Sequence, residues 1–220
     1  MIYTVISGIN EKDCCEKRQS ITSLPRAVER YILDTKNEQT REERLLAYTV
    51  LSFSLEKFYG IKEWNIEKNA YGKPNLVTYG EEKNLYINVS HSDGAVAVVL
   101  SDEGEVGVDI QAEILPERED RLKKRFFDFN VAKADDLSVA YLYFDRGGNF
   151  SELEMDNPED IISFTDKWSA CEAVMKCDGR GFSSLPELEK IQRNMHLTIK
   201  RISFEEKQFS LSIAKKRVVM

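Results

Sequence analysis

LYINVSHSDGAVAVVLSDEGEVGVDI, residues 85–110, is the stretch of sequence that decides the fold. It contains three runs rich in β-branched residues, at 85–90, 95–100 and 106–110, and such runs favour strands. Ser92-Asp93-Gly94 is a turn signal between the first two runs, and residues 101–105 supply a second one. We therefore predict three consecutive strands that pair as an antiparallel meander.

A long helix with an apolar face is predicted ahead of this stretch, over residues 41–58. Leu46, Val50 and Phe53 recur there at the spacing of one helix face, and Gly60 supplies a stop signal. An amphipathic helix of this length needs a partner surface for its apolar face. We expect this helix to pack on the sheet.

The remaining pattern predicts elements on both sides of these two. They are a strand at 2–7, a helix at 25–33, a strand at 139–144, a helix at 165–177 that stops at Asp178-Gly179, and a hairpin of 197–204 with 209–214. Each half of the chain therefore offers one long helix and several antiparallel strands. The order predicts an α+β fold of two comparable halves, residues 1–105 and 106–220.

The composition narrows the classes of partner. The 220 residues include 31 Lys plus Arg against 38 Asp plus Glu, a net charge of -7, so a polyanionic ligand needs a local basic cluster. Four cysteines without a CxxC pair and two histidines support neither a zinc site nor a disulfide scaffold. The sequence contains no secretory leader pattern and no membrane-length apolar run. We expect a cytoplasmic protein without nucleic-acid or membrane partners.

Two strand-associated stretches carry polar side chains that a plain core would not use. Asn88-Val89-Ser90-His91-Ser92 ends a predicted strand, and its hydroxyls, imidazole and turn amides suit phosphate oxygens, although a solvated turn is the plain alternative. In Val106-Gly107-Val108-Asp109-Ile110-Gln111, strand alternation puts Asp109 and Gln111 on one face. Their oxygens suit a hard cation such as magnesium, and a half-solvated edge strand is the plain alternative.

A third stretch lies on the helix predicted at 165–177. Trp168, Glu172 and Lys176 recur at i, i+4 and i+8, so they share one helix face, with a carboxylate one turn before an ammonium. A surface ion pair is the plain alternative for Glu172 and Lys176. Such pairs are worth only about 0.2 to 0.5 kcal/mol.

The three stretches, in this order, resemble the 4'-phosphopantetheinyl transferase family, in particular its surfactin-synthetase-activating type with two fused halves. Three further motifs strengthen the resemblance: Arg44-Leu45-Leu46, Tyr71-Gly72-Lys73-Pro74 and Lys124-Arg125-Phe126-Phe127. The matching positions run from about residue 41 to 182. The resemblance implies a pseudo-twofold pair of α+β halves, each an antiparallel sheet on a long helix, with the active site in the cleft between them.

The resemblance also implies a reaction and its residues. The enzyme would move phosphopantetheine from coenzyme A to a serine of an acyl or peptidyl carrier protein and release 3',5'-ADP. Three sets follow: catalytic residues Asp109, Glu172 and Lys176; Mg²⁺ ligands Asp109, Gln111 and Glu172; coenzyme A contacts Arg44, Lys73, Ser90, His91 and Lys176. Glu172, or a water that it holds with the metal, is the candidate base, and Lys123, Lys124 and Arg125 are expected to recognise an acidic carrier. We expect a monomer.

The chain departs from the family pattern at two positions. Many members have a lysine where this chain has Cys171, and members often have a carboxylate where Gln111 stands. The segment between Asp109 and Trp168 is longer than usual, with a predicted hairpin at 139–155 as the insertion.

Two rival functions remain open. One is a coenzyme-A-binding protein of the same fold without transferase activity. The other is a metal-dependent phosphodiesterase, for which the sequence has the acidic residues but lacks a second His or Asp cluster. The sequence does not indicate which carrier protein the enzyme would modify.

Overall fold

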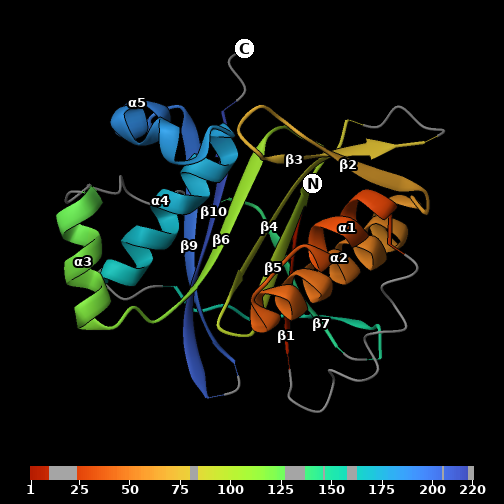
Figure 1. The fold of residues 1–220 in the computed structure, drawn as a ribbon, viewed down its shortest axis with the longest axis horizontal. Helices are drawn as coiled ribbons and strands as arrows, with labels where there is room; N and C mark the ends of the chain where they lie inside the picture. Colours follow the sequence, from red (N-terminus) through yellow and green to blue (C-terminus); the bar gives the residue numbers. More distant parts are fainter. Residues whose placement is uncertain are drawn as a thin grey trace.

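A computed structural model describes residues 1–9, 24–79, 84–126, 137–145, 147–157, 163–204 and 206–217. Its elements, in chain order, are β1 (Ile2–Gly8), α1 (Arg26–Leu33), α2 (Glu38–Tyr59), β2 (Trp64–Lys68), β3 (Pro74–Thr78), β4 (Tyr86–Ser92), β5 (Ala95–Ser101), β6 (Val106–Ala112), α3 (Pro116–Phe126), β7 (Ala140–Phe144), β8 (Phe150–Glu152), α4 (Phe164–Asp178), the 3₁₀ helix η4 (Gly181–Glu187), α5 (Leu188–Gln192), β9 (Met195–Phe204) and β10 (Lys207–Lys216). The class is α+β, as predicted (Figure 1).

The strands form three sheets within the described residues. Their orders are β4-β5-β1-β7-β8, β6-β10-β9 and β2-β3. All predicted helices and strands exist with bounds close to those expected, and the C-terminal hairpin is confirmed by the antiparallel pairing of β9 with β10. In Figure 1, β4 and β6 run side by side between α2 and α4.

The long helix α2 covers the five-stranded sheet. Its Leu51 is fully buried in one apolar cluster with Val5 of β1 and Val98 of β5. The side chain of Asn37 caps its first turn, and Gly60 ends it in the left-handed conformation with φ 71°. The packing of this helix on a sheet is as the sequence indicates.

The predicted meander is wrong at its third strand. β4 pairs with β5, but β5 has β1 on its other edge, so no edge of β5 remains for β6. β6 pairs with β10 instead. Its other edge meets β4 through side chains, because the oxygens of Asn88, Ser90 and Ser92 accept hydrogen bonds from the backbone N–H groups of three alternate β6 residues, Val108, Ile110 and Ala112, at 3.0–3.2 Å.

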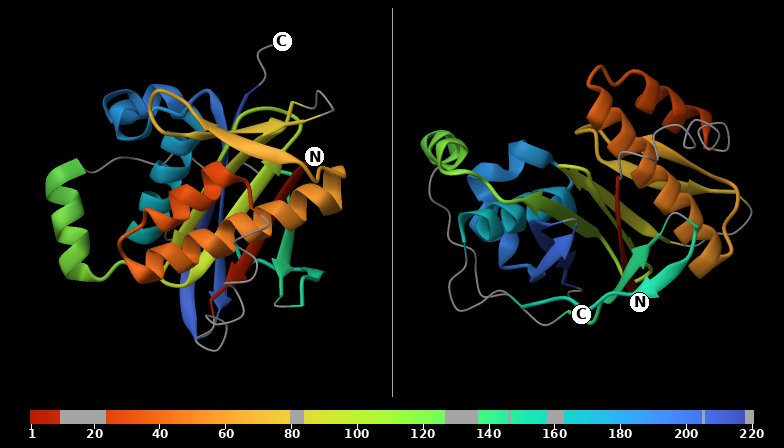
Figure 2. Two further views of the ribbon diagram at one scale, coloured as in Figure 1. Left: turned by 45° about the vertical axis from the view of Figure 1, so that its right-hand side comes forward. Right: turned by 90° about the horizontal axis from the view of Figure 1, so that it is seen from below.

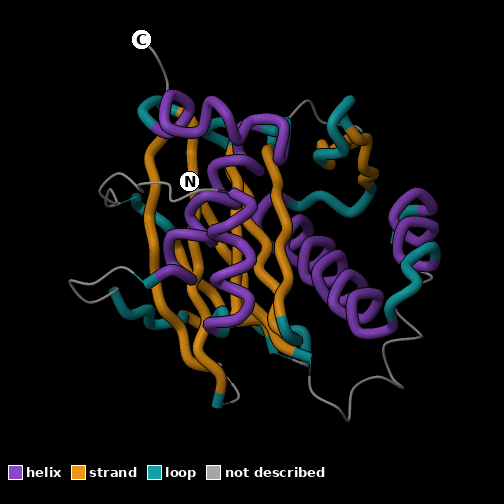
Figure 3. Tube along the Cα trace, turned by 60° about the vertical axis from the view of Figure 1, so that its left-hand side comes forward, coloured by secondary structure: helices purple, strands orange, loops and turns teal. Residues whose placement is uncertain are grey.

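The second long helix, α4, lies against the sheet that contains β6 (Figure 3). A capping box of Ser163 and Asp166 starts it, and Gly179 ends it with φ 88°. Gly107 of β6 permits a close approach, since a Cβ there would lie 2.2 Å from Ala173 O and 2.3 Å from Cys177 N. The glycine of the Val-Gly-Val-Asp stretch therefore sets the distance between β6 and α4.

The two long helices lie well apart, each beside its own sheet, in the right-hand view of Figure 2. The pseudo-twofold relation and the division at residue 105 stay predictions. The predicted hairpin at 139–155 exists as β7 and β8, and β7 pairs in parallel with β1. Residues beyond 106 thus complete the sheet that β1, β4 and β5 form.

Two smaller findings concern the membrane and the cysteines. No helix in the described ranges has the length and hydropathy that a membrane crossing requires. Cys171 and Cys177 are free and buried, whereas Cys14 and Cys15 lie outside the described residues.

Candidate functional site

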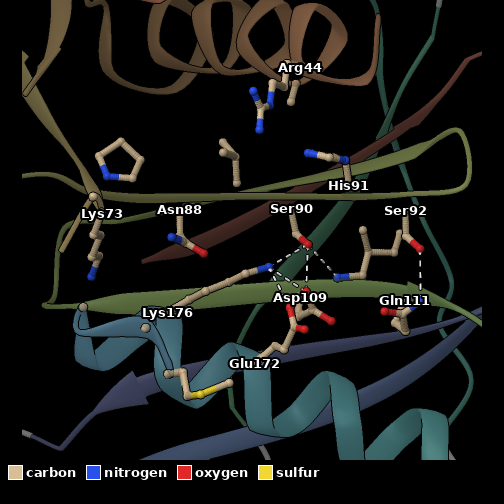
Figure 4. A pocket seen from close by; sticks show the side chains of 18 of the residues that line it. Arg44, Lys73, Asn88, Ser90, His91, Ser92, Asp109, Gln111, Glu172 and Lys176 are labelled. Carbon is tan, nitrogen blue, oxygen red and sulfur yellow. Dashed lines mark hydrogen bonds and ion pairs between the residues drawn. The ribbon is translucent and has the colours of Figure 1, made fainter. Parts of the chain in front are cut away.

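One pocket of about 500 Å³ is lined by every residue that the resemblance assigned to catalysis, to the metal or to coenzyme A. α2 contributes Arg44, the turn before β3 contributes Lys73, β4 contributes Ser90 and His91, β6 contributes Asp109 and Gln111, and α4 contributes Glu172 and Lys176. Figure 4 shows Arg44 and His91 on one side of β4 and the Asp109 group on the other. The pocket therefore lies where α2, β4, β6 and α4 meet.

Asp109 is the centre of the lower group. Its side chain is only 4% exposed, and its Oδ1 accepts from Lys176 Nζ at 2.6 Å and from Ser90 Oγ at 2.9 Å. Lys176 Nζ also donates to Ser90 Oγ at 2.9 Å and lies 3.8 Å from Glu172 Oε2. The plain alternative of an isolated surface pair between Glu172 and Lys176 is wrong, because the nearer carboxylate of Lys176 is Asp109.

The carboxyl group of Glu172 is strongly perturbed. Burial and the negative charge of Asp109 raise its pKa to about 7, and Lys176 only partly opposes them. Asp109 Oδ2 is buried and accepts no hydrogen bond from any described residue. Two carboxylates that share a single ammonium leave a net negative charge at the site. This charge favours the binding of a further cation.

Gln111 completes a set of oxygen donors. Its Nε2 donates to Ser92 Oγ at 3.2 Å and to Ala112 O at 3.1 Å, and Figure 4 shows its amide oxygen turned to the side of Asp109. The described residues contain no cluster of three His, Cys, Asp or Glu side chains suited to a metal. The buried orphan oxygen of Asp109, the Glu172 carboxylate and this amide oxygen together fit a hard cation such as Mg²⁺.

Arg44 forms the cationic end of the pocket. Its Nη1 donates to Thr35 Oγ1 at 2.7 Å, and its guanidinium lies 4.4 Å from the ring centre of Tyr31, which Lys68 also approaches at 3.8 Å. Its Nε is buried and donates no hydrogen bond to any of the residues that the structure describes. The plain alternative, an exposed arginine paired with a neighbouring Glu, is not seen in the described part of the chain, because Arg44 contacts no carboxylate there.

Lys73 lines the same pocket, but its ammonium is directed elsewhere. The side chain is 8% exposed and pairs with Glu105, and Nζ donates to Cys177 O at 3.2 Å near the C-terminal end of α4. Asn69 adds a bond from Nδ2 to Gly179 O at 3.0 Å. These contacts tie the β2-β3 turn to α4, and a contact of Lys73 with coenzyme A stays a prediction.

Glu43 contacts the pocket residue His91, and the sequence reasoning missed it. Its Oε2 lies 2.6 Å from His91 Nδ1, and its side chain is 5% exposed. A signal was present, because Glu43 precedes Ala47 and Val50 at i+4 and i+7 on the buried face of α2. A charged residue in an apolar stripe marks a buried polar contact.

Cys171 does not enter the pocket. It is buried in the apolar cluster between α4 and the β6-β10-β9 sheet, and burial raises the pKa of its thiol far above the ordinary value. The position where family members carry a lysine is therefore a packing position in this chain.

The basic-aromatic segment lies on α3. Lys123 pairs with Glu119 at 2.6 Å and lies 5.3 Å from the ring centre of Phe164, and Lys124 is exposed. The side chains of Arg125 and Phe126, and the whole of Phe127, lie outside the described residues. The role of this segment in carrier recognition stays a prediction.

Fold and pocket together define an α+β protein whose site joins a cationic end to a carboxylate pair. Over 110 residues the chain is 32% identical to the 4'-phosphopantetheinyl transferases AcpT of Salmonella typhi and of Salmonella typhimurium, and the match covers 50% of this chain and 48% of each relative. Over 113 residues it is 33% identical to a Synechocystis protein provisionally named 4'-phosphopantetheinyl transferase slr0495, with 51% and 38% covered. The chain thus spans at most about half the length of these relatives. No protein-family model matches it.

Proposed function

We propose that this protein is a 4'-phosphopantetheinyl transferase that uses coenzyme A as donor and a serine of an acyl or peptidyl carrier protein as acceptor. The similarity to three proteins with this name supports the general transferase function. The observation that carries the proposal is the shared pocket, which is lined by Arg44 of α2, Asp109 of β6 and Glu172 of α4.

The two ends of the pocket suit the two charged parts of coenzyme A. Arg44 and His91, which line the pocket on the same side of β4, bind the 3'-phosphate, because phosphate oxygens accept charge-assisted hydrogen bonds. Lys176 and Ser90 lie near the diphosphate and hold it over the carboxylate pair. A ligand that is anionic at both places spans the pocket.

Asp109, Gln111 and Glu172 would hold Mg²⁺, which would neutralise negative charge on the diphosphate. Glu172 accepts the proton of the carrier serine, directly or through a water. The serine oxygen then forms a bond to the β-phosphorus while the bond from that phosphorus to the bridging oxygen breaks. The 3',5'-ADP leaves with the electron pair, and Lys176 stabilises the charge on the phosphate oxygens.

Incubation with coenzyme A, Mg²⁺ and an apo carrier protein tests the proposal, with the intact mass of the carrier as readout. The transferase adds one phosphopantetheine to the carrier and releases 3',5'-ADP. A coenzyme-A-binding protein without transferase activity leaves the carrier mass unchanged while the ligand binds, and a phosphodiesterase cleaves coenzyme A without a change in the carrier. A carrier whose acceptor serine is replaced by alanine is the control. Monomeric state and cytoplasmic location stay predictions.

A further inference from the structure

Glu43 is a buried carboxylate that the proposed reaction does not use. It accepts three contacts from three different parts of the fold: Gly94 N–H donates to Oε1 at 2.8 Å, Gln39 Nε2 donates to Oε1 at 3.1 Å, and His91 Nδ1 lies 2.6 Å from Oε2. Both oxygens are therefore engaged, and the orientation of the carboxylate is fixed by α2 and by the β4-β5 turn.

The charge of Glu43 follows from these contacts. Burial by itself would raise its pKa, but the hydrogen bonds from His91 and from Gly94 N–H outweigh burial, so the pKa lies below the ordinary value. Glu43 is thus an ionised carboxylate at neutral pH, and an ionised carboxylate only accepts hydrogen bonds. His91 Nδ1 must therefore carry a hydrogen.

This constraint decides which nitrogen of His91 serves the pocket. With Nδ1 bound to Glu43, the nitrogen left for a ligand is Nε2, and His91 lines the pocket on the same side of β4 as Arg44 (Figure 4). A second hydrogen on Nε2 gives an imidazolium whose charge Glu43 balances on one side and an anionic ligand on the other. Glu43 then acts through His91 without contacting the ligand.

We propose that Glu43 is a positioning residue that fixes the tautomer and orientation of His91 and thereby sets the preference of the pocket for a ligand with a 3'-phosphate. This inference rests on the proposed function for the identity of the ligand. A purely structural Glu43, which only ties α2 to the Gly94 turn, would change stability without a change in tautomer or ligand preference.

The first test is ¹⁵N NMR of His91 in the ligand-free protein, at a pH at which the ¹⁵N shifts show a ring that carries a single hydrogen. His196 is the other histidine of the chain, so a His196→Gln variant assigns the signals. The wild type is expected to carry its hydrogen on Nδ1. Glu43→Gln, whose amide group can donate to Nδ1, should shift the hydrogen toward Nε2, and Glu42→Gln on the same helix turn should not. An unchanged His91 tautomer in Glu43→Gln overturns the proposal.

The second test compares the affinities of coenzyme A and dephospho-coenzyme A for the same proteins. Glu43→Gln should weaken coenzyme A by roughly two- to tenfold, the effect of one hydrogen bond, and leave dephospho-coenzyme A unchanged. Glu42→Gln should bind both as the wild type does. An equal loss for both ligands, or no loss for either, overturns the proposal. A wild type that binds neither ligand would refute the proposed function, and the NMR result would still decide whether Glu43 controls His91.

Discussion

At Asp109 and Glu172, two carboxylates share one ammonium. Lys176 donates to Asp109 Oδ1 at 2.6 Å and is more distant from Glu172 at 3.8 Å, so the group as a whole retains a negative charge. That imbalance, together with burial, explains why the pKa of Glu172 rises to about 7. The same imbalance favours the binding of a divalent cation, since the cation would relieve the repulsion between the two carboxylates.

The raised pKa of Glu172 predicts a pH-dependent effect on stability. The folded protein binds this proton more tightly than the unfolded chain, so between the ordinary pKa of 4.5 and about 7 the free energy of unfolding falls as the pH rises. In a chelator at about pH 8, Glu172→Gln should therefore raise the Tm by a few degrees, and at about pH 4 the difference should vanish. Calorimetry measures both.

Excess Mg²⁺ at about pH 8 should reverse the order, because only the wild type gains from binding the cation. Glu189→Gln on the exposed face of α5 is the control. It should leave the Tm unchanged both in the chelator and in excess Mg²⁺. A lower Tm for metal-free Glu172→Gln at about pH 8 would contradict the view that the two carboxylates repel each other.

At the scale of the elements, the close packing of α4 on β6 depends on one position. Gly107 has no side chain, and this absence lets α4 approach closely enough for Lys176 to reach Asp109. The atoms that a Cβ would meet, Ala173 O and Cys177 N, belong to the backbone of α4 and cannot rotate away. A larger residue must therefore move the whole helix.

Gly107→Ala is predicted to destabilise the fold by about 1–3 kcal/mol and to weaken the stabilisation by Mg²⁺. The helix shift separates Glu172 from Asp109, so the cation loses a ligand. Thermal unfolding with and without Mg²⁺ measures both effects. Gly60→Ala is the control, because a Cβ there meets nothing within 4 Å and only its φ of 71° is strained. A Gly107→Ala protein with wild-type stability and an unchanged Mg²⁺ response would show that the packing of α4 on β6 does not require glycine at position 107.

For the molecule as a whole, local signals in the sequence were sufficient for the elements but not for all of their pairings. The turn at Ser92-Asp93-Gly94 predicted the β4-β5 hairpin, because hairpin partners are adjacent in the chain. The pairing of β6 with β10, and that of β7 with β1, join strands far apart in sequence, and no local pattern encodes the choice. The resemblance named eight of the residues that line the pocket, whereas Glu43 could only have been found as a charge in an apolar stripe.

Carrier recognition is a prediction about the charge distribution of the whole molecule. An acidic carrier that approaches a protein of net charge -7 needs a local basic surface, and we predict that Lys123, Lys124 and Arg125 of the α3 sequence supply one. Replacing all three by alanine should raise the KM for the carrier severalfold and flatten its dependence on salt, with kcat retained. The matched control replaces Lys57 and Lys62 near the end of α2. An unchanged KM at low salt would exclude this surface.

The central claim is that one ligand spans the pocket from Arg44 on α2 to the carboxylate pair on β6 and α4. The most direct measurement is the affinity of coenzyme A and of dephospho-coenzyme A for the wild type and for Arg44→Ala, with Arg41→Ala as the control on the same helix. The wild type should prefer coenzyme A by roughly ten- to a hundredfold, the effect of a charge-assisted phosphate contact, and Arg44→Ala should lose most of that preference. A coupling near zero between the 3'-phosphate and Arg44 would contradict the claim.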